Sequence, residues 1–106
     1  MNPTVGKNTM YIISYDISKD KKRRKISREL ENYGKRVQYS VFECDLDKKR
    51  FDELYHKLVH LMGTDGTEDS IRVYSLCKNC VEKTTVIGVT SIRDGLDKQL
   101  EEIFVV

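Results

Sequence analysis

The sequence predicts an α+β fold in which two helices pack on one face of a sheet. Segments with strand-like and helix-like hydrophobic patterns follow one another in the order strand, helix, strand, helix, strand, strand. The length of 106 residues suits one compact domain. The contents of 39% hydrophobic and 34% charged residues are typical of a globular chain with a heavily charged surface.

The ends of the chain differ from its centre. Residues 1–9 contain the only proline and show no periodicity, so we expect a flexible N-terminal extension before a domain at residues 10–89. Residues 90–106 are expected to form a C-terminal tail that is either a short helix or an edge strand. Whether this tail contacts a partner chain cannot be decided from the sequence. The chain has no apolar run near the ~20 residues of a membrane span, no signal-peptide pattern and three cysteines, so we expect a cytoplasmic protein with no membrane partner.

The first strand is predicted at Tyr11 to Ile17, where β-branched and aromatic residues dominate. So short a continuous apolar stretch fits a central strand that is covered on both faces. The basic segment that follows is predicted to be a helix, because its apolar residues Ile26, Leu30 and Tyr33 recur at helical spacing. This narrow stripe must lie on the sheet, with the cations facing out.

The ends of that first helix carry residues with a known preference for such positions. Ser18 or Asp20 is a suitable N-cap, and Gly34 is a suitable C-terminal stop. In the second half of the chain, Asp47 is predicted to cap another helix and Gly63 to end it. The apolar residues of that helix have helical spacing: Phe51, Leu54, Leu58, Leu61 and Met62.

The stretch "RVQYSVFEC", residues 36–44, is strongly strand-forming, with Val37, Tyr39 and Val41 alternating with the residues between them. If it bends near residues 38–40 and supplies two strands, the element order becomes the βαββαβ of a ferredoxin-like fold. No glycine or proline forces this bend.

Two further strands are predicted at residues 70–76 and 83–89, joined across "CKNC". The resulting sheet leaves one face without helices. A bare apolar face on so small a domain predicts a homodimer through the sheet face.

Charge is unevenly distributed along the chain. Residues 19–36 contain nine Lys or Arg against three Asp or Glu, whereas residues 43–69 contain four against eight. We therefore expect one strongly basic surface and a polyanionic partner such as nucleic acid.

Three motifs together resemble a known family. "YDIS" closes the first strand, "YGKRVQYSVFEC" ends the Arg-rich helix, and "RVYSLC" leads to "VIGV". They resemble the small CRISPR-associated adaptation protein, often described as a CRISPR-associated endoribonuclease. The resemblance implies a homodimer of ferredoxin-like subunits, a Mg²⁺-dependent nuclease, and a role with the CRISPR integrase in capturing spacer DNA for antiviral defence. Its members differ in whether they cut RNA, DNA or nothing.

Asp16 is the candidate catalytic residue and metal ligand. Mg²⁺ takes one or two carboxylates together with waters and phosphate oxygens. In a two-fold dimer, Asp16 from both chains would hold one ion, which would polarise the scissile phosphate and activate a water. The alternative is that Asp16 caps the first helix, although Ser18 and Asp20 are better placed for that role.

Several other residues are candidates for nucleic-acid binding. Arg23, Arg24 and Arg28 belong to the basic run, which is either a phosphate-binding surface or a solvated helix face. Arg23 or Arg24 matches the family's helix arginine. The candidates outside the run are Tyr15, Arg36, Ser40 and Phe42. Phe42 either stacks on a base or belongs to the core or dimer interface. Tyr15 either contacts the substrate or simply packs within the sheet.

Two further patterns carry metal-like spacing. Cys77 and Cys80 have the CxxC spacing of zinc or redox sites, but four zinc ligands would require two chains, so a turn with two buried thiols is the preferred interpretation. His56 and His60 lie one helical turn apart without the Glu of HExxH, which favours an exposed helix flank.

The sequence therefore predicts a cytoplasmic, homodimeric, Mg²⁺-dependent endonuclease acting on RNA or DNA. The first alternative is a non-catalytic dimeric adaptor that bridges the CRISPR integrase and DNA. The second is a regulatory module that binds a small ligand at its dimer interface. No glycine-rich phosphate loop and no Ser/His/Asp set with a recognisable spacing is present.

Overall fold

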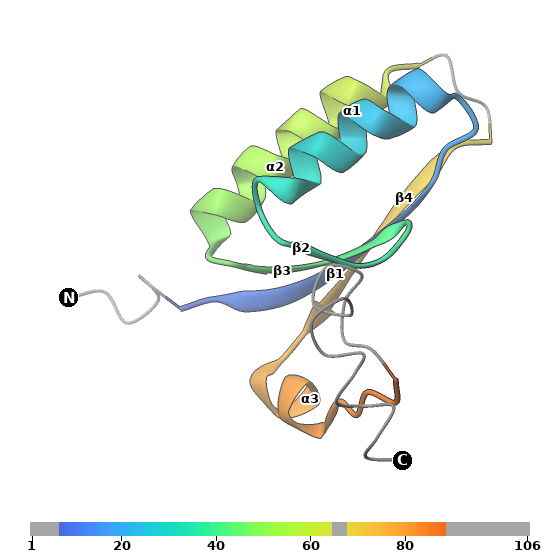
Figure 1. Cartoon of the computed structure of the whole chain (residues 1–106). Helices are drawn as coiled ribbons and strands as arrows, with labels where there is room; N and C mark the ends of the chain where they lie inside the picture. The colour runs from blue at the N-terminus through green and yellow to red at the C-terminus, as the bar shows by residue number, and fades with distance from the viewer. Residues whose placement is uncertain (1–6, 65–67, 89–106) are drawn as a thin grey trace.

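The computed structural model describes residues 7–64 and 68–88. Its elements are β1 (Thr9–Asp16), α1 (Asp20–Glu31), β2 (Lys35–Gln38), β3 (Val41–Leu46), α2 (Lys48–Met62), β4 (Ser70–Leu76) and α3 (Lys78–Lys83). The order from β1 to β4 is βαββαβ, and α1 and α2 lie side by side on one face of the sheet (Figure 1). The predicted α+β fold of the single chain is therefore confirmed.

The four strands form one antiparallel sheet in the order β2-β3-β1-β4. The central position predicted for the first strand is confirmed, since β1 pairs with β3 on one side and with β4 on the other. The register sets Ser14 opposite Arg72 and Asp16 opposite Ser70. The end of β1 that carries Asp16 therefore adjoins the beginning of β4.

The bend considered for "RVQYSVFEC" is present, because β2 and β3 form a hairpin around Tyr39 and Ser40. A register shift between Arg36 and Gln38 adds a bulge just before this turn. Bulges bend a strand and increase its twist, which lets the chain reverse here without glycine or proline. The single alternating strand expected over this stretch is wrong, since Tyr39 lies in the turn with 82% of its surface exposed.

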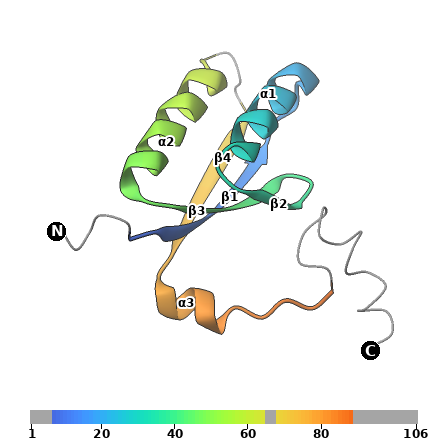
Figure 2. The same ribbon diagram turned by 60° about the vertical axis from the view of Figure 1, so that its left-hand side comes forward.

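The core fills the space between the sheet and the two long helices. Alternate residues of β1 and β3 point into it and meet the apolar stripes of α1 and α2. Its fully buried large side chains are Phe42, Ile13, Ile26, Leu30, Leu54 and Cys44. The other face of the sheet carries no long helix, and α3 lies on that side in both views (Figure 2).

Gly34 has a different role from the one predicted. Helix α1 ends earlier, at Glu31, with Asn32 as its C-cap. A Cβ atom at Gly34 would clash with the carbonyl oxygen of Glu43 and the sulfur of Cys44. Glycine is needed here because the turn after α1 passes so close to β3.

The predicted ends of α2 are confirmed, whereas the predicted caps of α1 are not. An oxygen of Asp47 accepts the backbone N–H of Arg50 at 2.8 Å, and Gly63 ends α2 with a positive φ of 62°. At α1, Lys19 occupies the N-cap position and makes no side-chain cap hydrogen bond.

The strand predicted at residues 83–89 is wrong for residues 83–88. Helix α3 (Lys78–Lys83) follows β4 directly, and residues 84–88 form no strand. Val89 and the predicted tail at residues 90–106 lie outside the described residues, as do residues 1–6 of the predicted extension. Among the described elements, no helix has the length and apolar character that crossing a membrane requires.

Candidate functional site

Asp16 lies exposed at the last position of β1. The buried side chains of Ile13 and Tyr15 face α1 and α2, so strand alternation places Asp16 with Ser14 on the opposite face of the sheet. We call it the helix-free face because it carries neither of the two long helices. Within residues 7–64 and 68–88, no group hydrogen-bonds or ion-pairs with its carboxylate. Asp16 also lies three residues before Lys19, the N-cap of α1, so it does not cap that helix.

Two residues of β4 that the sequence analysis missed lie beside Asp16. Ser70 is its direct cross-strand partner, and the exposed Arg72 is the partner of Ser14. Residues opposite one another share a face, and diagonal neighbours lie about 7–8 Å apart, within reach of a long side chain. A hydroxyl and a guanidinium group therefore share the helix-free face with the carboxylate. Ser70 and Arg72 are recognised as neighbours of Asp16 only from the pairing register of β1 and β4.

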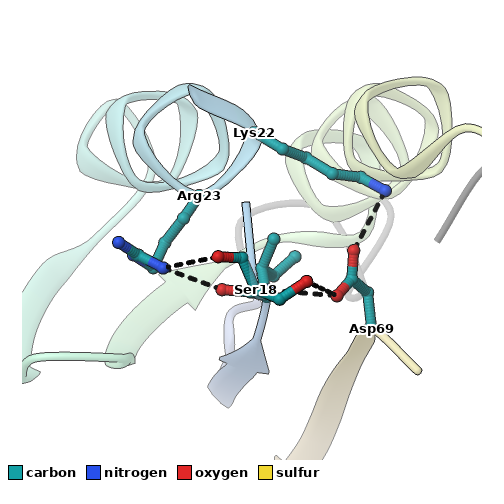
Figure 3. A network of polar contacts seen from close by, with 5 residues as sticks. Ser18, Lys22, Arg23 and Asp69 are labelled. Atoms are coloured by element: carbon teal, nitrogen blue, oxygen red, sulfur yellow. Dashed lines mark hydrogen bonds and ion pairs between the residues drawn. The ribbon is translucent and has the colours of Figure 1, made fainter. Parts of the chain in front are cut away.

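The turn that follows Asp16 is held by Asp69 (Figure 3). One oxygen of Asp69 accepts the backbone N–H of Ser18 at 3.1 Å and its hydroxyl at 3.2 Å. The other oxygen accepts Lys22 Nζ at 3.2 Å, and the Asp69 side chain is only 6% exposed. Asp69 therefore ties the start of β4 to the β1–α1 turn and to α1. No local pattern in the sequence indicates this role, because Ser18 and Lys22 lie 51 and 47 residues earlier in the chain.

The backbone N–H of Ser18 and then the side chains of Lys22 and Ser18 lower the pKa of Asp69. A carboxyl with a lowered folded-state pKa stabilises the fold at pH values above its unfolded value, about 3.9, and loses this contribution as the pH falls through the folded-state pKa. Asp69→Asn should therefore lower the free energy of unfolding near neutral pH. The difference from the unsubstituted protein should shrink below about pH 4, as urea unfolding at several pH values will measure. A difference that stays constant with pH would contradict this role.

Of the two arginines between which the sequence could not choose, Arg23 faces this turn. Its guanidinium donates to the carbonyl oxygens of Ile17 at 2.9 Å and of Ser18 at 3.4 Å, and Figure 3 shows Arg23 beside Ser18. The same guanidinium also contacts Asp20. Arg24 is exposed. Arg23 is therefore placed to hold the backbone next to Asp16, whereas Arg24 lies on the exposed side of α1.

The outer side of α1 carries a row of exposed cations, which we call the α1 basic stripe: Lys21, Arg24, Lys25 and Arg28. Their spacing of three and four residues places them along one side of the helix. The buried residues Ile26 and Leu30 lie on the opposite side. The stripe thus projects away from the sheet.

Arg36 is engaged within the fold. Its guanidinium lies 5.2 Å from the centre of the Phe42 ring and donates to the Tyr39 carbonyl oxygen at 3.2 Å. It also contacts the Ser27 hydroxyl and lies 3.5 Å from a carboxylate oxygen of Glu31. These contacts fasten the β2–β3 hairpin to α1.

The remaining candidates belong to the same hairpin and its packing. Phe42 is fully buried, so its ring offers no face to a base, and the core alternative holds for it. Tyr15 is 6% exposed, and its hydroxyl donates to the Tyr39 carbonyl oxygen at 3.0 Å. Ser40 is half-buried in the turn, where its carbonyl oxygen accepts the backbone N–H of Tyr15 at 3.0 Å. The structure therefore does not bring these three side chains together with the carboxylate of Asp16.

His56 and His60 are both exposed on α2, as expected for a helix flank. In the described part of the chain, no three His, Cys, Asp or Glu residues form a group that could hold a metal ion. Among the described carboxylates near this end of β1, Asp69 and Asp20 are engaged by Ser18, Lys22 and Arg23. The free carboxylate of Asp16 fits a hard oxygen-seeking ion only when water, substrate or a second chain completes its ligands.

A family model, a relative and two solved structures that are similar to this chain all concern the same protein family. The family model described as CRISPR associated protein Cas2 matches residues 9–84. CRISPR-associated endoribonuclease Cas2 1 of Chloroflexus aurantiacus is 49% identical over 78 residues, covering 74% of this chain and 83% of the relative. The crystal structure of Streptococcus pyogenes Cas2 matches with a TM-score of 0.63 at 33% identity, covering 74% of this chain and 99% of that chain. A chain of a partial Cas6-RT-Cas1–Cas2 complex matches with a TM-score of 0.66 at 37% identity, covering 79% and 90%.

Proposed function

The chain belongs to the Cas2 family of CRISPR-associated proteins, and from this premise we propose that it is a metal-dependent endonuclease of spacer acquisition. The observation that carries the proposal is the exposed carboxylate of Asp16, which has no partner among the described residues and lies on the helix-free face. Relatives named as CRISPR-associated endoribonucleases support phosphodiester hydrolysis as the reaction. A protein that acts on CRISPR nucleic acid would work in the cytoplasm, and we propose this location for the chain.

Asp16 is the residue that would hold Mg²⁺. One carboxylate per chain suits an ion that usually keeps several waters and binds substrate phosphate. A homodimer that packs through the helix-free faces supplies the second Asp16, and Ile12 and Tyr74 give this face apolar surface to bury. When bound, the ion polarises the phosphate and lowers the pKa of a water.

The other residues of the site bind and position. Arg72 shares the helix-free face with Asp16, and its guanidinium suits a phosphate oxygen of the substrate. Arg23 and Asp69 act through the turn, since their hydrogen bonds fix Ser18 and thereby the direction in which the chain leaves Asp16. Ser70, opposite Asp16, offers a hydroxyl that can orient a water.

The α1 basic stripe supplies affinity for the nucleic-acid backbone. Four exposed cations along one side of α1 concentrate positive charge on one surface, which attracts a polyanion. Such contacts release counterions, so binding should weaken steeply as salt is added. Contacts to phosphate groups do not distinguish one nucleotide sequence from another.

Reversing two charges of the stripe, Arg24→Glu with Arg28→Glu, should weaken binding of RNA and DNA and lower the salt slope by about two. Titration at several salt concentrations measures both effects. The matched control is Lys48→Glu with Lys49→Glu, which changes net charge equally at exposed positions of α2. Equal losses in the two variants would show that net charge alone, rather than the stripe, determines binding.

A second candidate function is a non-catalytic adaptor that bridges the CRISPR integrase and DNA. The similarity to a chain of a Cas1–Cas2 complex favours it. In this function the helix-free face forms the dimer interface and the α1 basic stripe binds DNA, while Asp16 has no catalytic role. Cleavage by an Asp16 variant separates the two candidates, because only the nuclease needs the Asp16 carboxylate.

A further inference from the structure

Cys77 and Cys80 form a thiol pair at the start of α3. Both are free and exposed, which corrects the prediction of two buried thiols. Their sulfur atoms are 3.3 Å apart, and Cys77 Sγ also accepts the backbone N–H of Cys80 at 3.4 Å. A disulfide has an S–S distance of about 2.05 Å, so a small approach within one helical turn would close the bond.

The three cysteines of the chain differ in exposure and in the pKa of their thiols. The backbone N–H and the thiol of Cys80 stabilise the Cys77 thiolate and lower the pKa of Cys77, while the same contact raises the pKa of Cys80. Burial, with the nearby charge of Glu43, raises the pKa of Cys44 to about 11. Because the thiolate is the nucleophile, Cys77 should react first and Cys44 should stay inert.

We propose that Cys77 and Cys80 form a reversible dithiol–disulfide site that exchanges with low-molecular-weight disulfides such as glutathione disulfide. The Cys77 thiolate attacks one sulfur of glutathione disulfide, forms a mixed disulfide and releases one glutathione thiolate. The Cys80 thiolate then attacks the Cys77 sulfur and expels the second glutathione. The protein loses two protons and two electrons, and one glutathione disulfide becomes two glutathione molecules.

The thiol pair is separate from the candidate nuclease site. Asp16 pairs with Ser70 at the start of β4, and Cys77 follows the last residue of the same strand. A seven-residue strand spans about 20 Å, so the two sites lie at opposite ends of the sheet. Helix α3 packs against β1 and β4, and a disulfide would staple its first turn where it joins that sheet.

The test follows the thiols of the full chain during incubation with glutathione disulfide, using acid quenching, alkylation and intact-protein mass spectrometry. The unsubstituted protein should lose two hydrogens with little adduct, and dithiothreitol should reverse the change. Cys80→Ser should accumulate one glutathione adduct, because no second thiol resolves it. Cys77→Ser, which keeps a good N-cap residue, should react about tenfold more slowly. Cys44 should be alkylated only after unfolding.

Three outcomes would overturn the proposal. The first is a stable glutathione adduct on the unsubstituted protein at the level found with Cys80→Ser, which would mean that the Cys77–Cys80 disulfide does not form. The second is equal reaction rates for Cys77→Ser and Cys80→Ser. The third is stoichiometric binding of Zn²⁺, at one ion per two chains, that blocks alkylation of both thiols and marks a shared metal site instead. None of these readouts depends on nuclease activity.

Discussion

Asp16→Asn is expected to abolish Mg²⁺-dependent cleavage of RNA or DNA, with a loss of about a hundredfold or more in rate. Asparagine keeps the size of the side chain but removes the negative charge that attracts the ion. The effect should be large because Asp16 carries the one carboxylate at this end of β1 that has no partner among the described residues, and in a dimer one substitution removes both copies. Single-turnover cleavage with and without Mg²⁺ measures it.

The controls for this prediction use the same face of the sheet. Asp45→Asn changes another exposed carboxylate on the helix-free face, where Asp45 pairs with Met10 at the far end of β1. It should leave cleavage unchanged. Both variants should fold within about 0.5 kcal/mol of the unsubstituted protein, as is usual for exposed positions. Undiminished cleavage by Asp16→Asn, with dimer and binding intact, would remove the metal role of Asp16 and favour the adaptor.

Hydrophobic periodicity was enough to predict the main elements of the fold. The apolar run of β1 and the helical spacing in α1 and α2 are local patterns, and local patterns are visible in a sequence. The Asp47 cap was predictable for the same reason, since its partner is the backbone of Arg50 only three residues away.

Features that depend on distant parts of the chain were missed. Ser18 was a reasonable cap for α1, but its hydroxyl and N–H pair with Asp69, which lies 51 residues later. Ser70 and Arg72 join the site only through the register of β4 against β1. No local pattern in the sequence specifies that register.

The error after β4 has a local cause. The β-branched residues near Val86 favour a strand, but helix α3 forms instead, with Cys77 as its N-cap and its sulfur accepting the N–H of Cys80. A thiol is an uncommon cap, so the sequence "CKNC" gives little indication that a helix begins there. The chain therefore continues after β4 as α3, which contacts β1 and β4 and whose first turn carries the thiol pair.

Charge counting predicted a basic surface but not the partner of each cation. Arg24 and Arg28 belong to the exposed stripe, as a count of cations indicates. Arg36 counts as a cation like the others, yet its guanidinium contacts the Tyr39 carbonyl oxygen, Glu31 and the Phe42 ring within the fold. Arginines next to an aromatic strand are therefore poor candidates for phosphate binding until their contacts are known.

Phe42→Ala is expected to destabilise the fold by about 3–5 kcal/mol, the usual cost of removing a fully buried aromatic ring. Urea unfolding measures this loss. If the ring instead stacked on a base, the substitution would mainly weaken nucleic-acid binding, by about 1–3 kcal/mol per base, and leave stability nearly unchanged. The two roles of Phe42 thus predict losses in different experiments.

Tyr39→Ala is the matched control, because Tyr39 is an exposed aromatic in the same hairpin. Its backbone carbonyl, which accepts hydrogen bonds from Tyr15 and Arg36, is retained, so stability should change by less than about 0.5 kcal/mol. Phe42→Leu keeps an apolar side chain in the cavity and should cost less than Phe42→Ala, giving a folded variant for binding assays. Weaker binding by folded Phe42→Leu, with Tyr39→Ala unaffected and little loss of stability, would contradict the core role.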